Sequence, residues 1–372
     1  MLLNSFRRAS SAWGARGFSS TCLRRGPDIS RKSRVIFSGI QPTGTPHLGN
    51  FLGALQNWVR LQEDSQPEDV LIYSIVGWHS LTLPQNPHAL AVARREMLAA
   101  LLAIGLDPKR VIIFHQDDNP HHTDLSWVFN CITPVGKLRR MTTWKARLAT
   151  SRNAKDESEV DESMLNTGLF TYPVLQAADI LLYKATHVPV GEDQKQHIEL
   201  ARDIGDNFNR TFRDLFPLPA YIATPTRRVL SLKDPTSKMS KSSPDISSRI
   251  LLTDSEKEIR TKIRSAVTDS ITGVTYDPAT RPGTSNLLSI LGACTNEEPA
   301  VVAKRFESKG HGDLKADVAD AVVALLERPR TEFERLRGEE AYITRIAKEG
   351  VEKAMVRSGA TMREVRHSVG LR

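Results

Sequence analysis

Two short segments have the residue types and spacing that suit chemistry on a phosphate. In the first, a turn rich in glycine and proline, residues 39–46, precedes His47 and Asn50 at the expected start of a helix. A strand, a turn and a helix N-terminus together present backbone N–H groups to an anion. In the second, Lys238 and Lys241 lie in a loop rich in Ser, Thr and Pro. Such a loop offers ammonium groups, hydroxyls and amides to a phosphate, although a lysine pair in a loop is more often a solvated surface.

Asp179 lies inside an apolar run, residues 172–183, which reads YPVLQAADILLY. The run is apolar nearly all round, so we expect a buried helix with Pro173 in its first turn. Tyr172 and Gln176 share the helical face of Asp179. A buried carboxylate needs a donor. Either an ion pair or a backbone cap supplies that donor, or a ligand does, through an indole N–H, a phenol O–H or an ammonium group.

A third segment, residues 188–197, again predicts a strand, a tight turn and a helix start. Val188 to Val190 are β-prone, Gly191 makes the turn, and Glu192 and Asp193 follow. An acidic residue at the carboxyl end of a parallel strand often binds a ribose hydroxyl. The helix is expected to continue to about Asn209.

Histidines and cysteines give little support for a metal site. The four histidines His79, His115, His121 and His122 do not have the spacing of a helical ligand pair, and we expect loop histidines to be solvated. Cys22, Cys131 and Cys294 form no CxxC or Cys/His cluster, which fits a reducing compartment.

Strands and helices that alternate at short spacing must position these residues. Beyond those already named, we expect the strands 35–38, 70–76, 111–114 and 228–232, and the helices 51–61 and 89–104. This alternation predicts an α/β fold, a Rossmann-like doubly wound parallel sheet whose ligands bind beyond the carboxyl ends of the strands. A basic helix at 136–149 and a polar loop at 151–163 would serve either a polyanion or only the solvent.

After Pro244 the pattern becomes helical. Apolar residues recur at intervals of three and four in five segments: 255–267, 285–292, 316–327, 331–337 and 339–357. We therefore expect a catalytic domain over residues 35–244 and a C-terminal α-helical domain over 245–372. The basic residues of its last part could meet phosphate or simply face water; they are Lys353, Arg357, Arg363, Arg366 and Arg372.

The net charge of +8 is concentrated at the N-terminus. Residues 1–34 hold eight basic side chains and one acidic one, a net charge of +7, so the rest of the chain is nearly neutral. This segment is rich in Arg and Ser, has no acid before Asp28, and contains RGFS at 16–19, which resembles a processing site. These features predict a mitochondrial presequence over residues 1–34, with its linker. A disordered RNA-binding arm is the alternative.

HxGN at 47–50 and KMSKS at 238–242 together resemble the signatures of class I aminoacyl-tRNA synthetases. SGIQPTG at 38–44, AADILLY at 177–183 and GEDQKQH at 191–197 make the chain similar to the tryptophanyl-tRNA synthetases, and the basic leader is similar to that of their mitochondrial forms. The resemblance extends from about residue 35 to the C-terminus. Ser243 departs from it, because the family usually has Asp after KMSKS.

This resemblance implies activation of L-tryptophan by ATP, followed by transfer to mitochondrial tRNA(Trp) in the matrix. The family's ATP-binding residues correspond to Gln41, Pro42, Thr43, Gly49, Asn50, Gly191, Glu192, Asp193, Val229, Lys238, Met239, Ser240, Lys241 and Ser242. Its tryptophan-binding residues correspond to Phe37, Tyr172, Asp179 and Gln194, and its catalytic residues to His47, Lys238 and Lys241. Mg²⁺ would be held mainly by the ATP phosphates, with no metal site in the protein. The helical domain would read the anticodon, and the enzyme would be a homodimer away from any membrane.

Three other interpretations stay open. A tyrosyl-tRNA synthetase shares the fold and both loops, although GEDQ and the setting of Phe37 argue against it. A nucleotidyltransferase that makes a small-molecule adenylate shares an HxGH motif but has no need of the helical C-terminal domain. A non-enzymatic RNA-binding relative would keep the fold and lose the loops, which are intact here.

Overall fold

The computed structural model describes residues 33–141, 144–145, 148, 163, 165–191, 194–223, 229–241 and 243–371. Residues 34–372 form one compact unit. The predicted leader lies almost wholly outside the described residues, as does most of the predicted loop at 151–163. Among the described residues, no helix has the length and apolar composition needed to cross a membrane.

Within the described part of the chain, five parallel strands form one sheet in the order β3-β2-β1-β4-β5. The strands are β1 (Val35–Ile40), β2 (Val70–Ile75), β3 (Val111–His115), β4 (His187–Val190) and β5 (Ala220–Ala223). β1 pairs in register with β2 from Val35 opposite Val70 to Ile40 opposite Ile75. The order places β1 at the centre and reverses beside it, which makes the doubly wound sheet that the sequence predicts.

Side chains from the two faces of the sheet enter two different hydrophobic cores. On β2, Leu71, Tyr73 and Ile75 enter one core, whereas Ile72 enters the other, as the alternation of side chains along a strand requires. The first core also contains residues of α2 (Gln56–Glu63) and α4 (Pro87–Ala103). The second contains residues of α5 (His121–Ile132), α8 (Thr167–Leu181) and α9 (Lys195–Thr211). Helices therefore cover both faces, and ligands of such a sheet are expected at the carboxyl ends of its strands.

The predicted helix at 51–61 is present, but its first turn is wider than expected. α1 (Leu48–Asn50) leads into a π-helical turn, η1 (Phe51–Leu55), before α2 begins. Asn57 donates its side-chain amide to the Gly53 carbonyl across this turn (3.0 Å). π-Turns within helices occur often at functional sites, and this one follows the HxGN segment directly.

Before residue 244, three sequence predictions about elements are wrong. The basic helix expected at 136–149 is not continuous, because α6 (Val135–Arg139) ends before Arg140 and Met141. Residues 229–232 form no strand of the sheet; they pair with the KMSKS loop through a bridge between Leu230 and Lys238, and the fifth strand is β5. α8 begins at Thr167, so Pro173 lies inside the helix and not in its first turn. An interior proline removes one backbone hydrogen bond. Val174, Ala177, Ala178 and Leu181 are all fully buried, and this packing stabilises the helix in spite of the proline.

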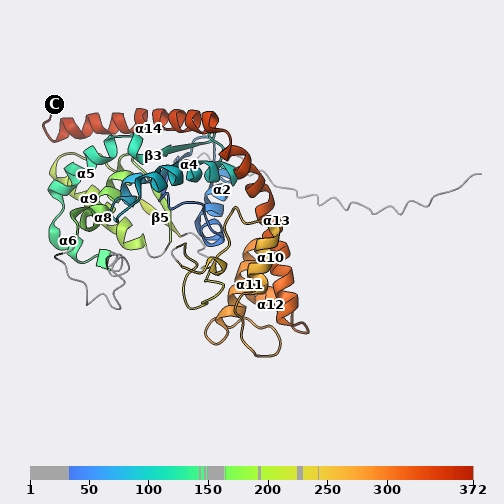
Figure 1. Ribbon diagram of the computed structural model, residues 1–372. Coiled ribbons are helices and arrows are strands. Elements are labelled where there is room, and N and C mark those ends of the chain that lie inside the picture. The colour runs from blue at the N-terminus through green and yellow to red at the C-terminus, as the bar shows by residue number, and fades with distance from the viewer. Residues whose placement is uncertain are drawn as a thin grey trace, which may run out of the picture. The chain divides into compact units, whose positions relative to one another are not determined.

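After residue 244 the described chain is helical, as expected, with boundaries that differ from the predicted ones. The elements are α10 (Glu256–Arg264), α11 (Pro282–Thr295), α12 (Pro299–Lys304), α13 (His311–Arg337) and α14 (Glu340–Ser368). α13 continues through Pro329, where the sequence predicted a break, and α12 was not expected. Figure 1 shows α14, in red, running past β3 and α5, and it packs against both.

α14 lies very close to the sheet at Gly350. A Cβ atom on this glycine would come within 1.8 Å of the Ile113 carbonyl oxygen of β3. Only glycine can therefore occupy the crossing without moving the helix. The C-terminal helix is fixed directly against the strand that leads to the functional edge.

Candidate active site

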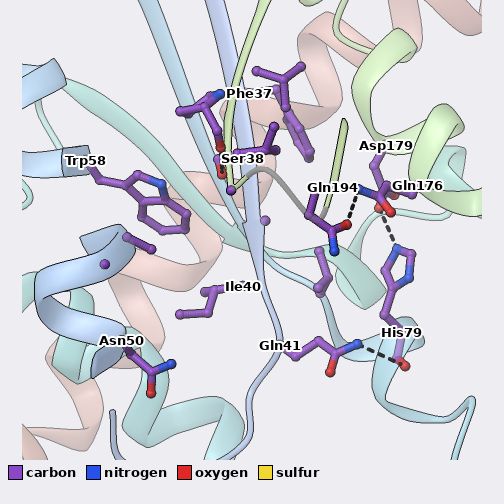
Figure 2. Close-up of a pocket in the computed structure, with 18 of the residues that line it drawn as sticks. Phe37, Ser38, Ile40, Gln41, Asn50, Trp58, His79, Gln176, Asp179 and Gln194 are labelled. Carbon is purple, nitrogen blue, oxygen red and sulfur yellow. Dashed lines mark hydrogen bonds and ion pairs between the residues drawn. The ribbon is translucent and has the colours of Figure 1, made fainter. Parts of the chain in front are cut away.

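A cavity of about 840 Å³ opens at the carboxyl edge of the sheet. Its walls come from the ends of β1 and β4, from α8, and from the turn that follows HxGN. Figure 2 shows Asp179, Gln176 and His79 on one side of the view, with Trp58 and Asn50 on the other. Its volume is in the usual range for a small-molecule site, and parallel sheets bind ligands at this edge.

Asp179 is 2% exposed and accepts hydrogen bonds from three side chains on other elements. Its Oδ1 accepts from Gln116 Nε2 (2.6 Å) and His122 Nδ1 (2.7 Å), and its Oδ2 pairs with His79 Nε2 (2.8 Å). Figure 2 shows the His79 ring directed at this carboxylate. The interpretation in which the protein itself supplies donors to Asp179 is therefore correct. The same carboxylate also lines the cavity.

The donors around Asp179 keep it ionised in spite of its burial. Burial by itself raises the pKa of this carboxyl, but the hydrogen bonds from His122 and His79 outweigh it and lower the pKa to about 2. Asp179 is thus a carboxylate at neutral pH, and it acts only as an acceptor.

Tyr172, Gln176 and Gln194 lie beside Asp179 in the cavity wall. The Tyr172 hydroxyl pairs with His197 Nε2 (3.1 Å), and His197 Nδ1 pairs with Gln194 Oε1 (2.9 Å). Gln176 Nε2 donates to Gln194 Oε1 at 3.4 Å, a contact drawn in Figure 2. Phe37 also lines the cavity, so the structure brings together all four side chains of the expected amino-acid site.

His47 is the N-cap of α1, and its contacts fix its tautomer. The backbone N–H of Asn50 donates to His47 Nδ1 (3.2 Å), while the backbone N–H of His47 donates to Asn50 Oδ1 (3.2 Å). Because Nδ1 is an acceptor, the proton of the neutral ring lies on Nε2. A Cβ atom on Gly49 would come within 3.0 Å of the His47 ring, so the small residue keeps this arrangement open.

His47 is neutral at physiological pH. Its burial, followed by the charges of Lys241, Lys238 and Arg249, lowers its pKa to about 4. Two of these charges belong to the KMSKS loop, so the two predicted phosphate-binding segments lie close together. A neutral imidazole with its proton on Nε2 can donate one hydrogen bond without adding a third positive charge to the lysines.

The KMSKS loop contacts the turn before His47. Lys241 Nζ donates to the carbonyl oxygens of Gly44 (2.7 Å) and Thr43 (3.2 Å). The Leu48 N–H donates to the Ile250 carbonyl (2.8 Å), which ties HxGN to the segment after KMSKS. Burial lowers the pKa of Lys241 to about 8; Glu96 opposes this shift and Arg249 adds to it. Lys241 is thus a partly desolvated cation held by backbone carbonyls.

The predicted ATP-binding residues, together with the predicted catalytic His47, divide into three groups. Those that line the cavity are Gln41, Gly49, Asn50, Gly191, Val229 and Lys238. Those placed outside its wall are Pro42, Thr43, His47, Met239, Ser240 and Lys241, of which Met239 is a core residue at 2% exposure. Glu192, Asp193 and Ser242 lie outside the described residues.

Sequence reasoning missed the partners of Asp179. His79, His115 and His122 are buried, which contradicts the expectation of solvated loop histidines. His79 and His122 donate to Asp179, and Gln116 was not singled out at all. Their positions just after β2 and β3 were the available signal, because parallel strands bring such residues to one edge. Among the described residues, no group of three or more His, Cys, Asp or Glu could hold a metal ion.

Comparison with known proteins places this geometry in a family. Residues 30–327 match the model of the class I tRNA synthetases for tryptophan and tyrosine. The chain is 41% identical over 346 residues to the mitochondrial tryptophan--tRNA ligase of Schizosaccharomyces pombe, covering 91% of this chain and 96% of that one. Two tryptophanyl-tRNA synthetase structures are similar. The one from Mycoplasma pneumoniae has a TM-score of 0.78 at 32% identity, with 91% and 98% of the chains covered. The one from Campylobacter jejuni, complexed with ADP and tryptophan, has a TM-score of 0.73 at 30% identity, with 90% and 99% covered.

Proposed function

The chain belongs to the class I tRNA synthetases for tryptophan and tyrosine, and from this premise we propose that it is specific for tryptophan. It activates L-tryptophan with ATP and transfers the tryptophanyl group to tRNA(Trp), giving Trp-tRNA, AMP and diphosphate. One observation carries the proposal: a buried, ionised Asp179 and the cation Lys238 line the same cavity. The 41% identity to a tryptophan--tRNA ligase supports the choice of amino acid.

The amino acid occupies the part of the cavity beside α8. Asp179 accepts the indole N–H, because it is an ionised acceptor in a wall that also offers the apolar side chains of Phe37 and Ile180. Tyr172 and Gln194 take the ammonium group, since both line the cavity near Asp179 and carry oxygen acceptors. The related Campylobacter jejuni enzyme was solved with tryptophan and ADP, which supports a site for each molecule.

ATP lies along the turn at 39–50 and the KMSKS loop. Gln41, Gly49, Gly191 and Val229 line the cavity and are proposed to hold the adenosine. Glu192 and Asp193 lie outside the described residues, and only the sequence resemblance supports their proposed contact with the ribose. His47 donates from Nε2 to a phosphate oxygen. Lys238 and Lys241 neutralise charge on the phosphates, Lys241 after leaving the carbonyls of Thr43 and Gly44.

The reaction needs no covalent enzyme intermediate. The tryptophan carboxylate attacks the α-phosphorus in line, the bond to the bridging oxygen breaks, and diphosphate leaves with that bond's electrons. The 2′- or 3′-hydroxyl of the tRNA end then attacks the adenylate carbonyl and releases AMP. Catalysis therefore consists of positioning and of stabilising phosphoryl charge. Mg²⁺ fits this scheme as an ion carried by the ATP phosphates, because Mg²⁺ is usually bound through substrate phosphates and water.

The helical region 245–372 is the proposed reader of the anticodon. On α14, Lys353 donates to the Pro108 carbonyl (3.0 Å) and Arg366 pairs with Asp124 (2.8 Å), so these two of the predicted basic residues contact the protein itself. Arg357 and Arg363 are the better candidates for phosphate contact, and Arg372 lies outside the described residues. A homodimer is the proposed assembly.

The protein is proposed to act in mitochondria, in the matrix. The Schizosaccharomyces pombe relative is named as mitochondrial, and residues 1–34 carry +7 of the +8 net charge but none of the motifs. Deleting residues 1–25 should leave aminoacylation intact and abolish import, measured with purified protein and isolated mitochondria. Loss of tRNA affinity on truncation would favour the RNA-binding arm instead.

Amino-acid-dependent exchange of labelled diphosphate into ATP tests the proposal. Tryptophan should support exchange without tRNA, and tyrosine should not. Exchange with tyrosine would indicate a tyrosyl-tRNA synthetase. Exchange with neither would favour a small-molecule adenylate or a non-enzymatic RNA-binding role.

A further inference from the structure

Behind Asp179, a chain of buried hydrogen bonds continues away from the cavity. His122 contacts Asp179 through Nδ1, and its Nε2 lies 2.8 Å from the Tyr183 hydroxyl. Asn119 Nδ2 lies 3.0 Å from the same hydroxyl and 3.0 Å from Ser358 Oγ of α14. All five residues are 3% exposed or less. These hydrogen bonds thus connect the cavity wall, through residues on or next to α8 and α5, to the C-terminal helix α14.

The side-chain amide of Asn119 fixes which group donates in each of these hydrogen bonds. The backbone N–H of His121 donates to Asn119 Oδ1 (3.2 Å), so the other end of that amide must be the donor, Nδ2. Asn119 therefore donates to the Tyr183 oxygen, and the single proton of Tyr183 is left for His122 Nε2. Burial raises the pKa of Tyr183 well above its usual value, so this proton stays in place.

The lone pairs of the Asp179 carboxylate limit the number of donors that it can accept. His122 accepts at Nε2, so it carries its proton on Nδ1 and donates to Asp179 Oδ1. A carboxylate offers about four acceptor positions. Among the described residues, Gln116 and His122 use the two on Oδ1, and His79 uses one on Oδ2. One position on Oδ2 is left for a ligand, which matches a single indole N–H.

We propose that Tyr183 is a positioning residue for amino-acid specificity. Its hydroxyl donates to His122 Nε2 and so orients the ring whose Nδ1–H donates to Asp179, which leaves one acceptor position of Asp179 for the indole N–H. Asn119 and Ser358 support that hydroxyl from outside, so the C-terminal helix helps to build the amino-acid site. This inference rests on the proposed specificity for tryptophan.

The Tyr183 ring is held separately from its hydroxyl. It stacks on Phe37 with ring centroids 5.6 Å apart and meets the edge of Phe114 at 5.8 Å. Tyr183→Phe therefore keeps the packing and removes only the hydrogen-bonding group. Without that hydroxyl, His122 Nε2 loses its donor, so the His122 ring, and with it Asp179, is no longer held in one orientation.

The test compares two substrates in the diphosphate-exchange assay. One is tryptophan; the other is 3-(3-benzothienyl)alanine, which has nearly the same shape but has sulfur in place of the indole N–H. Tyr183→Phe should lower kcat/KM for tryptophan by about tenfold, a tenfold change being about 1.4 kcal/mol. It should leave kcat/KM for the analogue and KM for ATP unchanged, so the preference for tryptophan falls by the same factor.

Tyr73→Phe is the matched control. Tyr73 is fully buried on β2, and its hydroxyl donates to the Trp58 carbonyl (3.2 Å) and not to the partners of Asp179. This variant should lose stability without changing the preference for tryptophan. Ser358→Ala, at the outer end of the chain, should lower the preference by about twofold and serves if Tyr183→Phe does not fold.

The outcomes separate this inference from the proposed function. If the unaltered enzyme shows no tryptophan-dependent exchange, the proposed function fails and the inference with it. If the unaltered enzyme exchanges with tryptophan, but Tyr183→Phe slows both substrates equally or neither, the function stands and the positioning role of Tyr183 is overturned. An equal fall in preference in Tyr73→Phe would also overturn it.

Discussion

Asp179 and Lys238 line the same cavity, but Asp179 and Lys241 of the KMSKS loop are held by their surroundings in different ways. Asp179 is 2% exposed, and three side-chain donors from other elements hold it. Lys241 instead donates to the backbone carbonyls of Thr43 and Gly44, groups it must leave to reach a phosphate. The Asp179 side is thus complete before a substrate arrives, whereas the lysine side must rearrange. Under the proposed function, specificity resides in the first side and phosphate chemistry in the second.

Substitution of Asp179 should have the largest effect on stability. Asp179→Ala leaves the donors of His79, Gln116 and His122 without their acceptor, and should cost about 3–5 kcal/mol of unfolding free energy. Asp179→Asn can still accept, so it should be milder. Urea denaturation measures both, and tryptophan kinetics at saturating ATP should show selective loss in the folded fraction. A variant that melts early yet binds tryptophan normally would show that Asp179 is only a structural partner.

Substitution on the lysine side should act on rate and not on folding. Lys238→Ala and Lys241→Ala should each slow diphosphate exchange by about 10²–10³-fold, the size seen when one transition-state donor is removed. Melting temperatures should stay near that of the unaltered enzyme, because neither lysine is part of a core. Exchange at the unaltered rate in either variant would remove that lysine from the mechanism.

Burial of His47, and after it the charges of the two lysines, should make stability depend on pH. The pKa of His47 is about 4 in the folded state, against about 6.5 when unfolded. Between these values the unfolded chain binds the extra proton, so stability falls as the pH decreases. His47 should contribute a loss of about 2 kcal/mol between pH 7 and pH 5. Unfolding curves at both pH values should show a smaller loss in His47→Gln; an equal loss would mean that His47 is protonated normally.

The sequence predicted these two sides unequally, for a physical reason. The residues of the lysine side lie in two contiguous motifs, HxGN and KMSKS, which could be recognised from the sequence. The structure brings the two motifs together. The partners of Asp179 are far away in sequence; His79 lies 100 residues before it and Gln116 lies 63. Only the sheet order β3-β2-β1 brings them to one edge. That convergence could be expected in general but not assigned to particular side chains.

Prediction of the helices and strands from local sequence patterns was limited in the same way. The first four strands follow from apolar runs and were predicted correctly. The run at 228–232 looked the same, yet its described part pairs with Lys238 in the KMSKS loop and not with the sheet. Pro173 and Pro329 suggested a helix start and a break, but burial of the surrounding side chains carries α8 and α13 through both. Tertiary packing, absent from local patterns, decided these cases.

The most direct test of this contrast is titration calorimetry of tryptophan in the absence of ATP, on the unaltered enzyme and on the double variant Lys238→Ala, Lys241→Ala. If the Asp179 side is complete without the phosphate machinery, both proteins bind tryptophan with the same Kd, although the double variant has lost diphosphate exchange. A Kd raised tenfold or more in a folded double variant would contradict the account, because it would mean that the lysines help to build the amino-acid site.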